Sequence, residues 1–324
     1  MSVQHKKALI TGINGQDGSY LAELLLEKGY EVHGLLRREA IEDADHRLTN
    51  IHNILERCQL HLGSIESYPP VFKAVYDVQP DECYHLAAKS FVDFSFDTEF
   101  STLNTNISGA HYVLSALQQA APKCRFYFSG SSEMFGNVTV SPQNESTPFY
   151  PRSIYGISKL AGFHLTQNYR NQYGLFACTG ILYNHESPRR GHAFVTRKIV
   201  SHAVKIKKGE IKELRLGNLD AKRDWGHAKD YVRAMWLMLQ EDAPDDFVIA
   251  SGKLHTVREF VERVFNRLGL NYNHHVVIDR NLFRPTEKVP LAGDAQKARS
   301  KLGWETTFSF EDLINDMIEQ ELSA

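Results

Sequence analysis

The sequence predicts an α/β protein with a doubly wound parallel sheet, followed by a smaller, mixed α/β C-terminal domain. Through the first half of the chain, short apolar runs alternate with amphipathic stretches, which is the pattern of βαβ units. The length of 324 residues exceeds the size at which a single hydrophobic core stops growing, which favours two domains. From residue 184 onward the alternation degrades into basic loops and isolated helical patterns. We therefore expect a second, less regular domain in that part of the chain.

Each strand is expected at a short apolar run, and each helix where apolar residues recur at helical spacing. The first half is expected to hold strands at residues 7–11, 31–36, 59–62, 82–86, 125–129 and 176–182, with helices at 20–28, 71–78, 104–120 and 157–173. The second half is expected to hold helices at residues 230–239, 257–268 and 310–322 and a strand at 247–251. Strands that alternate with helices imply a parallel sheet covered on both faces. We expect one domain to comprise residues 1–182 and 218–251, and the other 183–217 and 252–324.

The composition excludes several classes of protein. With 37 basic and 39 acidic side chains, the chain has a net charge of -2, which gives no global attraction for nucleic acids or anionic membranes. No apolar run approaches the ~20 residues of a membrane-spanning helix, and the polar first seven residues lack the apolar core of a secretory signal. A cytoplasmic location is the expectation. The four cysteines are scattered without a CxxC pair and are expected to be reduced thiols: Cys58, Cys83, Cys124 and Cys178.

A glycine-rich segment, TGINGQDG at residues 11–18, joins the first expected strand to the first expected helix. Glycines at this spacing allow a tight turn, close approach of the backbone to a pyrophosphate and close packing of the helix, whose N-terminal amides face the anion. The alternative is a tight turn without a ligand. The position in the first βαβ unit favours a Rossmann-like dinucleotide site. Its expected cofactor contacts are Gly12, Asn14, Gly15, Gln16, Asp17 and Gly18.

Two arginines, Arg37 and Arg38, follow the second expected strand. An NAD site would place an acidic residue there on the ribose 2′-hydroxyl, whereas basic side chains fit a 2′-phosphate. The alternative is a solvated surface pair, and Glu39 would weaken a phosphate site if it pointed inward. The pattern favours NADP as the cofactor.

Tyr155 and Lys159 form a YxxxK motif near the start of an expected helix. Four residues are about one helical turn, so both side chains lie on one face. An ammonium beside a phenol lowers its pKa from ~10 toward the range of a general base. The spacing occurs by chance in many helices, but here it follows a dinucleotide motif and a parallel-sheet pattern. The pair is therefore a candidate for proton abstraction coupled to hydride transfer.

Ser131 and Glu133 follow the strand expected at residues 125–129, at the sheet edge where such folds bind ligands. Ser131 can hydrogen-bond the hydroxyl that Tyr155 deprotonates. Oxidation of a sugar carbon needs only the serine, tyrosine and lysine, so the carboxyl group of Glu133 is an additional acid or base. A second proton transfer indicates an elimination. The alternative for Glu133 is a solvated loop carboxylate.

Taken with these motifs, the chain resembles the GDP-mannose 4,6-dehydratases, in the extended branch of the short-chain dehydrogenase/reductase superfamily. The resemblance covers nearly the whole length. The segments that carry it are residues 8–20, 131–136, 147–159, 184–198, 216–231 and 283–287. It implies a redox-neutral conversion of GDP-mannose into GDP-4-keto-6-deoxymannose: oxidation at C4, elimination of water across C5 and C6, and reduction at C6.

The resemblance also assigns residues to roles. The catalytic set it implies is Ser131, Glu133, Tyr155 and Lys159. Further cofactor contacts are expected at Ser64, Ile65, Leu86, Ala87, Ala88, Tyr155, Lys159, His185 and Arg190. Substrate contacts are expected at Ser90, Glu133, Asn184, Lys198, Arg223, Arg284 and Glu287. No metal site is expected, because His185-Glu186 lacks the HExxH spacing. A homodimer is expected, with a tetramer as the alternative.

Three departures from the family pattern keep other functions open. Ser64 stands where the family usually has Asp, Glu39-Ala40 replaces serines, and Lys89 replaces a neutral amide near the expected sugar pocket. These leave GDP-manno-heptose as an alternative substrate. A 4-reductase or epimerase on the same scaffold would need the YxxxK motif but not Glu133. A non-catalytic nucleotide sensor would be expected to have lost Tyr155 or Lys159.

Overall fold

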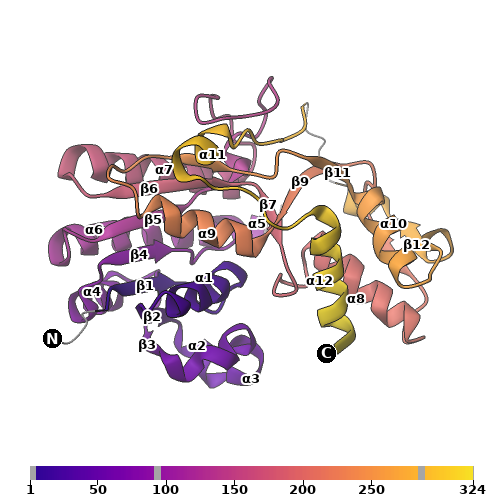
Figure 1. Ribbon diagram of the computed structural model, residues 1–324, viewed down its shortest axis with the longest axis horizontal. Coiled ribbons are helices and arrows are strands. Elements are labelled where there is room, and N and C mark those ends of the chain that lie inside the picture. Colours follow the sequence, from indigo (N-terminus) through magenta and orange to yellow (C-terminus); the bar gives the residue numbers. More distant parts are fainter. Residues whose placement is uncertain (1–4, 91–95, 284–288, 324) are drawn as a thin grey trace.

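A seven-stranded parallel sheet forms the centre of the larger lobe (Figure 1). The computed structural model describes residues 5–90, 96–283 and 289–323. The strand order is β10-β6-β5-β4-β1-β2-β3, which reverses direction between β1 and β4 and confirms the predicted doubly wound fold. The strands are β1 (Lys7–Thr11), β2 (Glu31–Leu36), β3 (Cys58–Leu62), β4 (Glu82–His85), β5 (Arg125–Ser129), β6 (Ala177–Leu182) and β10 (Phe247–Ile249).

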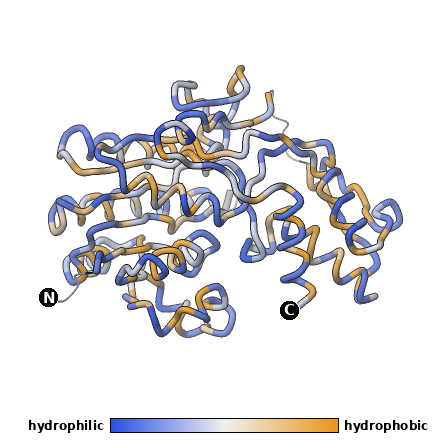
Figure 2. Tube along the Cα trace, in the orientation of Figure 1, coloured by the Kyte–Doolittle hydropathy of each residue, from blue (hydrophilic) through white to orange (hydrophobic). Residues whose placement is uncertain are grey.

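Helices cover both faces of this sheet because alternate residues of each strand point to opposite sides. In β1, Ala8 and Ile10 pack with α1 (Gln16–Glu27) and α9 (Ala228–Met238) in one core. Leu9 packs on the other face in a second core, with residues of the helices that cover it. These are α4 (Tyr68–Val78), α6 (Gly109–Ala120) and α7 (Ile154–Tyr173). In Figure 2, hydrophobic and hydrophilic residues alternate along the helices, as expected for helices with one buried face.

A second lobe lies on the right of Figure 1 and has its own core. Helices α8 (Val195–Lys207), α10 (Val257–Arg267) and α12 (Phe310–Ser323) supply Ile199, Phe260 and Met317 to it. A three-stranded sheet, ordered β11-β9-β7, joins the lobes, and β8 pairs with β12. These strands are β7 (Asn184–Glu186), β8 (Leu214–Leu216), β9 (Lys222–His227), β11 (Leu254–Thr256) and β12 (Val276–Ile278).

The remaining elements are short or were absent from the sequence prediction. They are α2 (Arg38–Glu42), α3 (Ala44–Arg47), η1 (Thr49–Arg57), α5 (Phe96–Leu103), η2 (Asn104–Ser108), η3 (Ser132–Met134), η4 (Tyr272–His274), η5 (Arg280–Leu282) and α11 (Gln296–Leu302). The basic loops expected after residue 184 include helix α8, whose lysines and arginine obscured its apolar face. Among the described residues, none of the helices has the length and hydropathy needed to span a membrane.

The division into domains remains a proposal. Strand β10 and helix α9 pack with the larger lobe, as the expected boundaries require. Ala298, Leu302 and Trp304 were placed in the second domain, yet they pack in the core formed with α1 and α9. We propose that the chain makes two crossings beyond those expected: it enters the larger lobe near residue 290 and returns to the second lobe before α12, whose Leu313 and Met317 pack there.

Candidate active site

A cleft of about 1020 Å³ opens between the two lobes, at the carboxyl edge of the parallel sheet. Loops after the strands line one side of it, and residues from the second lobe line the other. Of the predicted site residues that the structure describes, all but Arg38 line this cleft: Gly12, Asn14, Gly15, Gln16, Asp17, Gly18, Arg37, Ser64, Ile65, Leu86, Ala87, Ala88, Ser90, Ser131, Glu133, Tyr155, Lys159, Asn184, His185, Arg190, Lys198 and Arg223. Arg284 and Glu287 lie outside the described residues.

The glycine-rich loop fits a bound diphosphate. Gly12 has a φ of +78°, and a Cβ atom there would lie 2.8 Å from the backbone nitrogen of Ala87. Gly15 is the N-cap of α1, and no side chain caps the helix amides. The first amides of a helix have no partner within the helix and attract anions. Because Gly12 packs closely against Ala87 and no side chain caps the first amides of α1, these backbone N–H groups are available to a ligand in the cleft.

Gly12→Ala is expected to lower both the stability of the fold and the affinity for a dinucleotide. The left-handed conformation alone costs about 1–2 kcal/mol for an alanine, and the contact with Ala87 adds to that. Gly174→Ala is the matched control, because Gly174 also has a positive φ, +67°, but nothing lies within 4 Å of its Cβ position. Urea unfolding and a cofactor titration measure both effects. Equal losses in the two variants would contradict the role given to close packing at Gly12.

Arginines approach the cleft from the segment after β2. Arg37 is exposed and lines the cleft, whereas Arg38 begins α2 and is exposed elsewhere. Arg47, which the sequence analysis did not single out, lines the cleft as well. Its Nε donates to Asp43 Oδ2 at 3.2 Å, and its carbonyl accepts from Asn14 Nδ2 at 3.1 Å. No motif spacing points to Arg47; only the fold of the short helices brings it to the phosphate loop.

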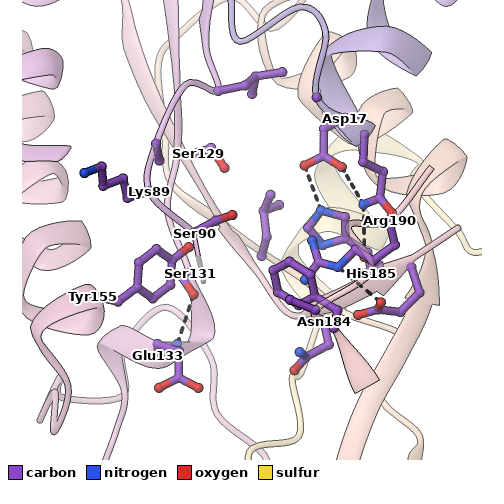
Figure 3. Close-up of a pocket in the computed structure, with 18 of the residues that line it drawn as sticks. Asp17, Lys89, Ser90, Ser129, Ser131, Glu133, Tyr155, Asn184, His185 and Arg190 are labelled. Carbon is purple, nitrogen blue, oxygen red and sulfur yellow. Dashed lines mark hydrogen bonds and ion pairs between the residues drawn. The ribbon is translucent and has the colours of Figure 1, made fainter. Parts of the chain in front are cut away.

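The four catalytic candidates line the cleft after the end of β5 and at the start of α7, and Figure 3 shows three of them, Ser131, Glu133 and Tyr155, near one another. Ser131 Oγ accepts the backbone N–H of Glu133 at 3.2 Å, which fixes the short turn that carries both residues. At the start of α7, Ser153 caps the helix through the Gly156 N–H and so positions Tyr155. Lys159 is buried one turn further along, with Nζ 5.8 Å from the centroid of the Tyr155 ring. The helix therefore presents both side chains to the cleft.

The expected lowering of the Tyr155 pKa by Lys159 is wrong for this structure. Burial raises the pKa of Tyr155 to about 12, against an opposing hydrogen bond with Ser131. Burial also lowers the pKa of Lys159 to about 8. The physical reason is burial, which disfavours the charged phenolate; Lys159 Nζ donates to the carbonyl of Ser129 at 2.8 Å and gives the phenol no hydrogen bond that would offset it. Tyr155 needs additional positive charge in the cleft to act as a base near neutral pH.

Basic side chains line the second-lobe side of the cleft. The Arg190 guanidinium lies 3.2 Å from Glu186 Oε2 and 3.5 Å from the centroid of the Phe194 ring. Lys198 Nζ donates to the carbonyl of Arg215, and Arg223 Nη1 donates to the carbonyl of Lys222. With Arg37 and Arg47 on the opposite side, the cleft has basic side chains on both sides, and such side chains suit phosphate oxygens.

Lys89 lines the cleft, but its ammonium contacts Ser101 Oγ. In Figure 3 the side chain extends away from Ser131 and Asn184. Its backbone is held on both sides by Asn106, whose side chain accepts the Lys89 N–H at 2.8 Å and donates to the Lys89 carbonyl. The departure from the family pattern at this position therefore adds a charge at the margin of the cleft and not between the catalytic side chains.

The glycine-rich first turn of a parallel sheet, with a serine, a tyrosine and a lysine at its carboxyl edge, defines the class as a short-chain dehydrogenase/reductase of the extended type. Within that class, the chain belongs to the GDP-mannose 4,6 dehydratase family, whose profile matches residues 9–317. "GDP-mannose 4,6 dehydratase 1" of Arabidopsis thaliana is 48% identical over 325 residues, covering 98% of this chain and 90% of the relative. The Homo sapiens "GDP-mannose 4,6 dehydratase" is 46% identical over 338 residues, covering 97% and 91%.

Solved structures share the fold at lower identity. A UDP-glucose 4-epimerase from Thermotoga maritima with UDP-glucose has a TM-score of 0.85 and 25% identity, covering 97% of this chain and 98% of the other. A dTDP-glucose 4,6-dehydratase from Bacillus anthracis in complex with NAD has a TM-score of 0.83 and 20% identity, covering 97% and 96%. Because epimerases and dehydratases share this architecture, the side chains in the cleft, and not the fold, determine which reaction is catalysed.

Proposed function

We propose that this chain catalyses the 4,6-dehydration of GDP-mannose with a nicotinamide cofactor. The observation that carries the proposal is that Glu133 lines the same cleft as Ser131, Tyr155 and Lys159. The family relatives named above favour GDP-mannose over GDP-manno-heptose. Incubation of the purified protein with each GDP-sugar tests the proposal: a 4-keto product should form from GDP-mannose without added reduced cofactor. Formation from the heptose alone would reverse the substrate assignment.

In the proposed reaction, Tyr155 takes the proton of the C4 hydroxyl while Ser131 holds the same oxygen. A bound nicotinamide cofactor supplies an acceptor for the C4 hydride, a donor for the later reduction of C6, and in its oxidised form a positive charge. Glu133 then removes the proton at C5, which the C4 ketone has made acidic, and protonates the C6 hydroxyl as it leaves as water. When C6 is reduced, C5 must regain a proton, and Tyr155 holds the one that it took from the C4 hydroxyl. The cleft holds the intermediate between the two hydride transfers, so no external reductant or acid is consumed.

The two rival functions differ at specific side chains. A reductase or epimerase uses the tyrosine and lysine but has no need of a carboxyl group at position 133. A nucleotide sensor needs none of the four. Because all four candidates line the cleft, the arrangement favours the dehydratase over both.

We further propose that NADP is the cofactor. The shared fold does not decide this, because the neighbour from Bacillus anthracis is described with NAD, and an RMD structure from Pseudomonas aeruginosa, with a TM-score of 0.80 and 19% identity, with NADPH. The proposal rests on Arg37, which lines the cleft after β2, where a 2′-phosphate would be bound.

Arg37→Ala is expected to erase most of the preference for NADP. A charge-assisted contact with phosphate is worth roughly 1.5–3 kcal/mol, or about ten- to hundredfold in affinity. Arg38→Ala is the matched control, since Arg38 does not line the cleft, and its effect should be smaller. Dissociation constants for NADP and NAD, measured at one salt concentration, check this. Equal affinity of the wild type for both dinucleotides would contradict the NADP assignment.

A homodimer is proposed on the exposed apolar residues of two neighbouring helices. Phe100 on α5 is 69% exposed and Ile157 on α7 is 44% exposed, and the two helices pack side by side. A tetramer is the alternative. The resemblance to the dehydratases implies that in a tetramer the segment after Arg37 reaches a neighbouring subunit's cofactor. Here that segment carries Glu39, Glu42, Asp43 and Asp45, which would repel the cofactor phosphate. Light scattering with and without NADP distinguishes dimer from tetramer.

A cytoplasmic location is proposed on the sequence arguments alone.

A further inference from the structure

An ion pair joins the glycine-rich segment at residues 11–18, here called the phosphate loop, to β7 in the sheet that connects the lobes. His185 Nε2 lies 2.8 Å from Asp17 Oδ2 (Figure 3). The side chains are 10% and 18% exposed, respectively. Gln16, the neighbour of Asp17, donates to the His185 carbonyl at 3.1 Å and accepts from Ser187 Oγ at 2.8 Å. The first turn of α1 is therefore fixed to β7 and the residue after it by several hydrogen bonds.

The hydrogen bonds indicate which protons His185 carries. Its Nδ1 lies 2.7 Å from the carbonyl of Tyr183, and a carbonyl oxygen only accepts, so Nδ1 must be protonated. Its Nε2 faces a carboxylate oxygen, which also accepts. Both ring nitrogens therefore donate, and His185 is an imidazolium paired with the Asp17 carboxylate. The ring stacks on Tyr231 of α9, with centroids 4.5 Å apart and planes at 20°, a contact that also suits a cation.

The surroundings supply charges of both signs. Burial opposes protonation of His185, Asp17 on α1 favours it, and Arg190 beyond β7 opposes it. The net result is a raised pKa for His185 and a lowered pKa for Asp17. Asp17 also acts on Lys159 and Tyr155 of α7, favouring the charged lysine and the neutral tyrosine. Among the described residues, Tyr231 on α9 stacks on the His185 ring and Tyr127 on β5 is influenced by the Asp17 charge, while Glu186 on β7 pairs with Arg190.

A carboxylate in a loop that receives a diphosphate presents an electrostatic problem. Alone, Asp17 would repel the anion that the amides of α1 attract, and its partial burial would strengthen the repulsion. We propose that His185 is the counter-ion of Asp17: its positive charge neutralises the phosphate loop so that an anionic dinucleotide can bind there. His185 is thus a positioning residue: its two ring N–H groups already donate to the Tyr183 carbonyl and to Asp17. This inference rests on the proposed nicotinamide function of the cleft.

A double-mutant cycle tests the inference by dinucleotide affinity, measured by calorimetric titration with NADP and with NAD. His185→Gln leaves the Asp17 carboxylate without its counter-ion, and affinity should fall by about tenfold or more. Asp17→Asn removes the negative charge and keeps the shape, because an asparagine amide can donate to a neutral His185. The double variant should recover most of the affinity lost in His185→Gln. Additive losses, or a double variant as weak as His185→Gln, would mean that His185 binds the cofactor directly.

His227→Gln is the control for loss of a buried histidine–carboxylate pair. His227 Nε2 lies 2.9 Å from Asp316 Oδ2, and His227 does not line the cleft. Its replacement should lower thermal stability without changing dinucleotide affinity. A loss of affinity equal to that of His185→Gln would show that the effect is a general consequence of unfolding and would overturn the inference.

A second measurement begins with the wild-type protein, so its first result does not depend on whether any variant folds. Nitrogen NMR of labelled wild-type protein should show His185 protonated at both ring nitrogens above pH 6.5, and Asp17→Asn should convert it to a neutral ring. A neutral His185 in the wild type at pH 6.5 overturns the proposal. Turnover of GDP-mannose by the wild type tests the proposed function separately, so failure of one can be told from failure of the other.

Discussion

Replacing Glu133 by glutamine is expected to stop the reaction after oxidation at C4. Glutamine keeps the shape of the side chain but cannot accept the C5 proton, while Ser131, Tyr155 and Lys159 are untouched. Loss of a positioned acid or base costs about two to four orders of magnitude in rate, so formation of the 4-keto-6-deoxy product should fall by at least about a hundredfold. The partial reaction should persist, because it does not use the carboxyl group.

The measurement is a single turnover with enzyme in excess. In Glu133→Gln the absorbance of reduced nicotinamide should appear and remain, whereas in the wild type it should rise and decay within each turnover. Glu133→Asp is the matched comparison, since it keeps a carboxyl group at a shorter reach and should retain part of the elimination. If Glu133→Gln dehydrates GDP-mannose at nearly the wild-type rate, the dehydratase proposal loses the observation that carries it.

Local patterns in the sequence were sufficient to predict the sheet. Strands such as β2 and β5 begin and end at the expected residues, because a parallel strand is buried on both faces and its middle is mostly apolar. Helix α1 was expected from residue 20, but it begins at Gln16. Its first turn carries polar residues that serve the cleft, so the apolar period starts one turn late.

The candidate site was predicted where a motif is contiguous and missed where it is not. Glycine spacing and YxxxK lie within one element each, so the sequence locates them. The contact of Asp17 with His185 joins residues 168 positions apart, and the approach of Arg47 depends on three short helical segments between β2 and β3. The pKa of Tyr155 was misjudged for a related reason: spacing places Lys159 on the same helix face, but burial, which spacing does not report, has the larger effect.

Tyr155→Phe is expected to abolish the first step itself. The phenyl ring has nearly the same shape, so the fold and dinucleotide affinity should be retained, but it cannot take the C4 hydroxyl proton. The rate should fall by about two to four orders of magnitude. Lys159→Ala should differ, because Lys159 is buried and bonded to Ser129. Removing it is expected to reduce dinucleotide affinity and stability together with the rate.

The absorbance of reduced nicotinamide in a single turnover also distinguishes Tyr155→Phe from Glu133→Gln. No reduced nicotinamide should form in Tyr155→Phe, because the block precedes hydride transfer. The direction in which the rate of C4 oxidation changes with pH is a further test. Burial places the pKa of Tyr155 near 12, so the phenolate is the minor form at neutral pH and the wild-type rate of C4 oxidation should rise with pH. Oxidised cofactor, which brings positive charge, should move that rise to lower pH. A Tyr155→Phe enzyme that reduces the nicotinamide at the wild-type rate would require another base in the cleft and would refute the proposed proton transfer.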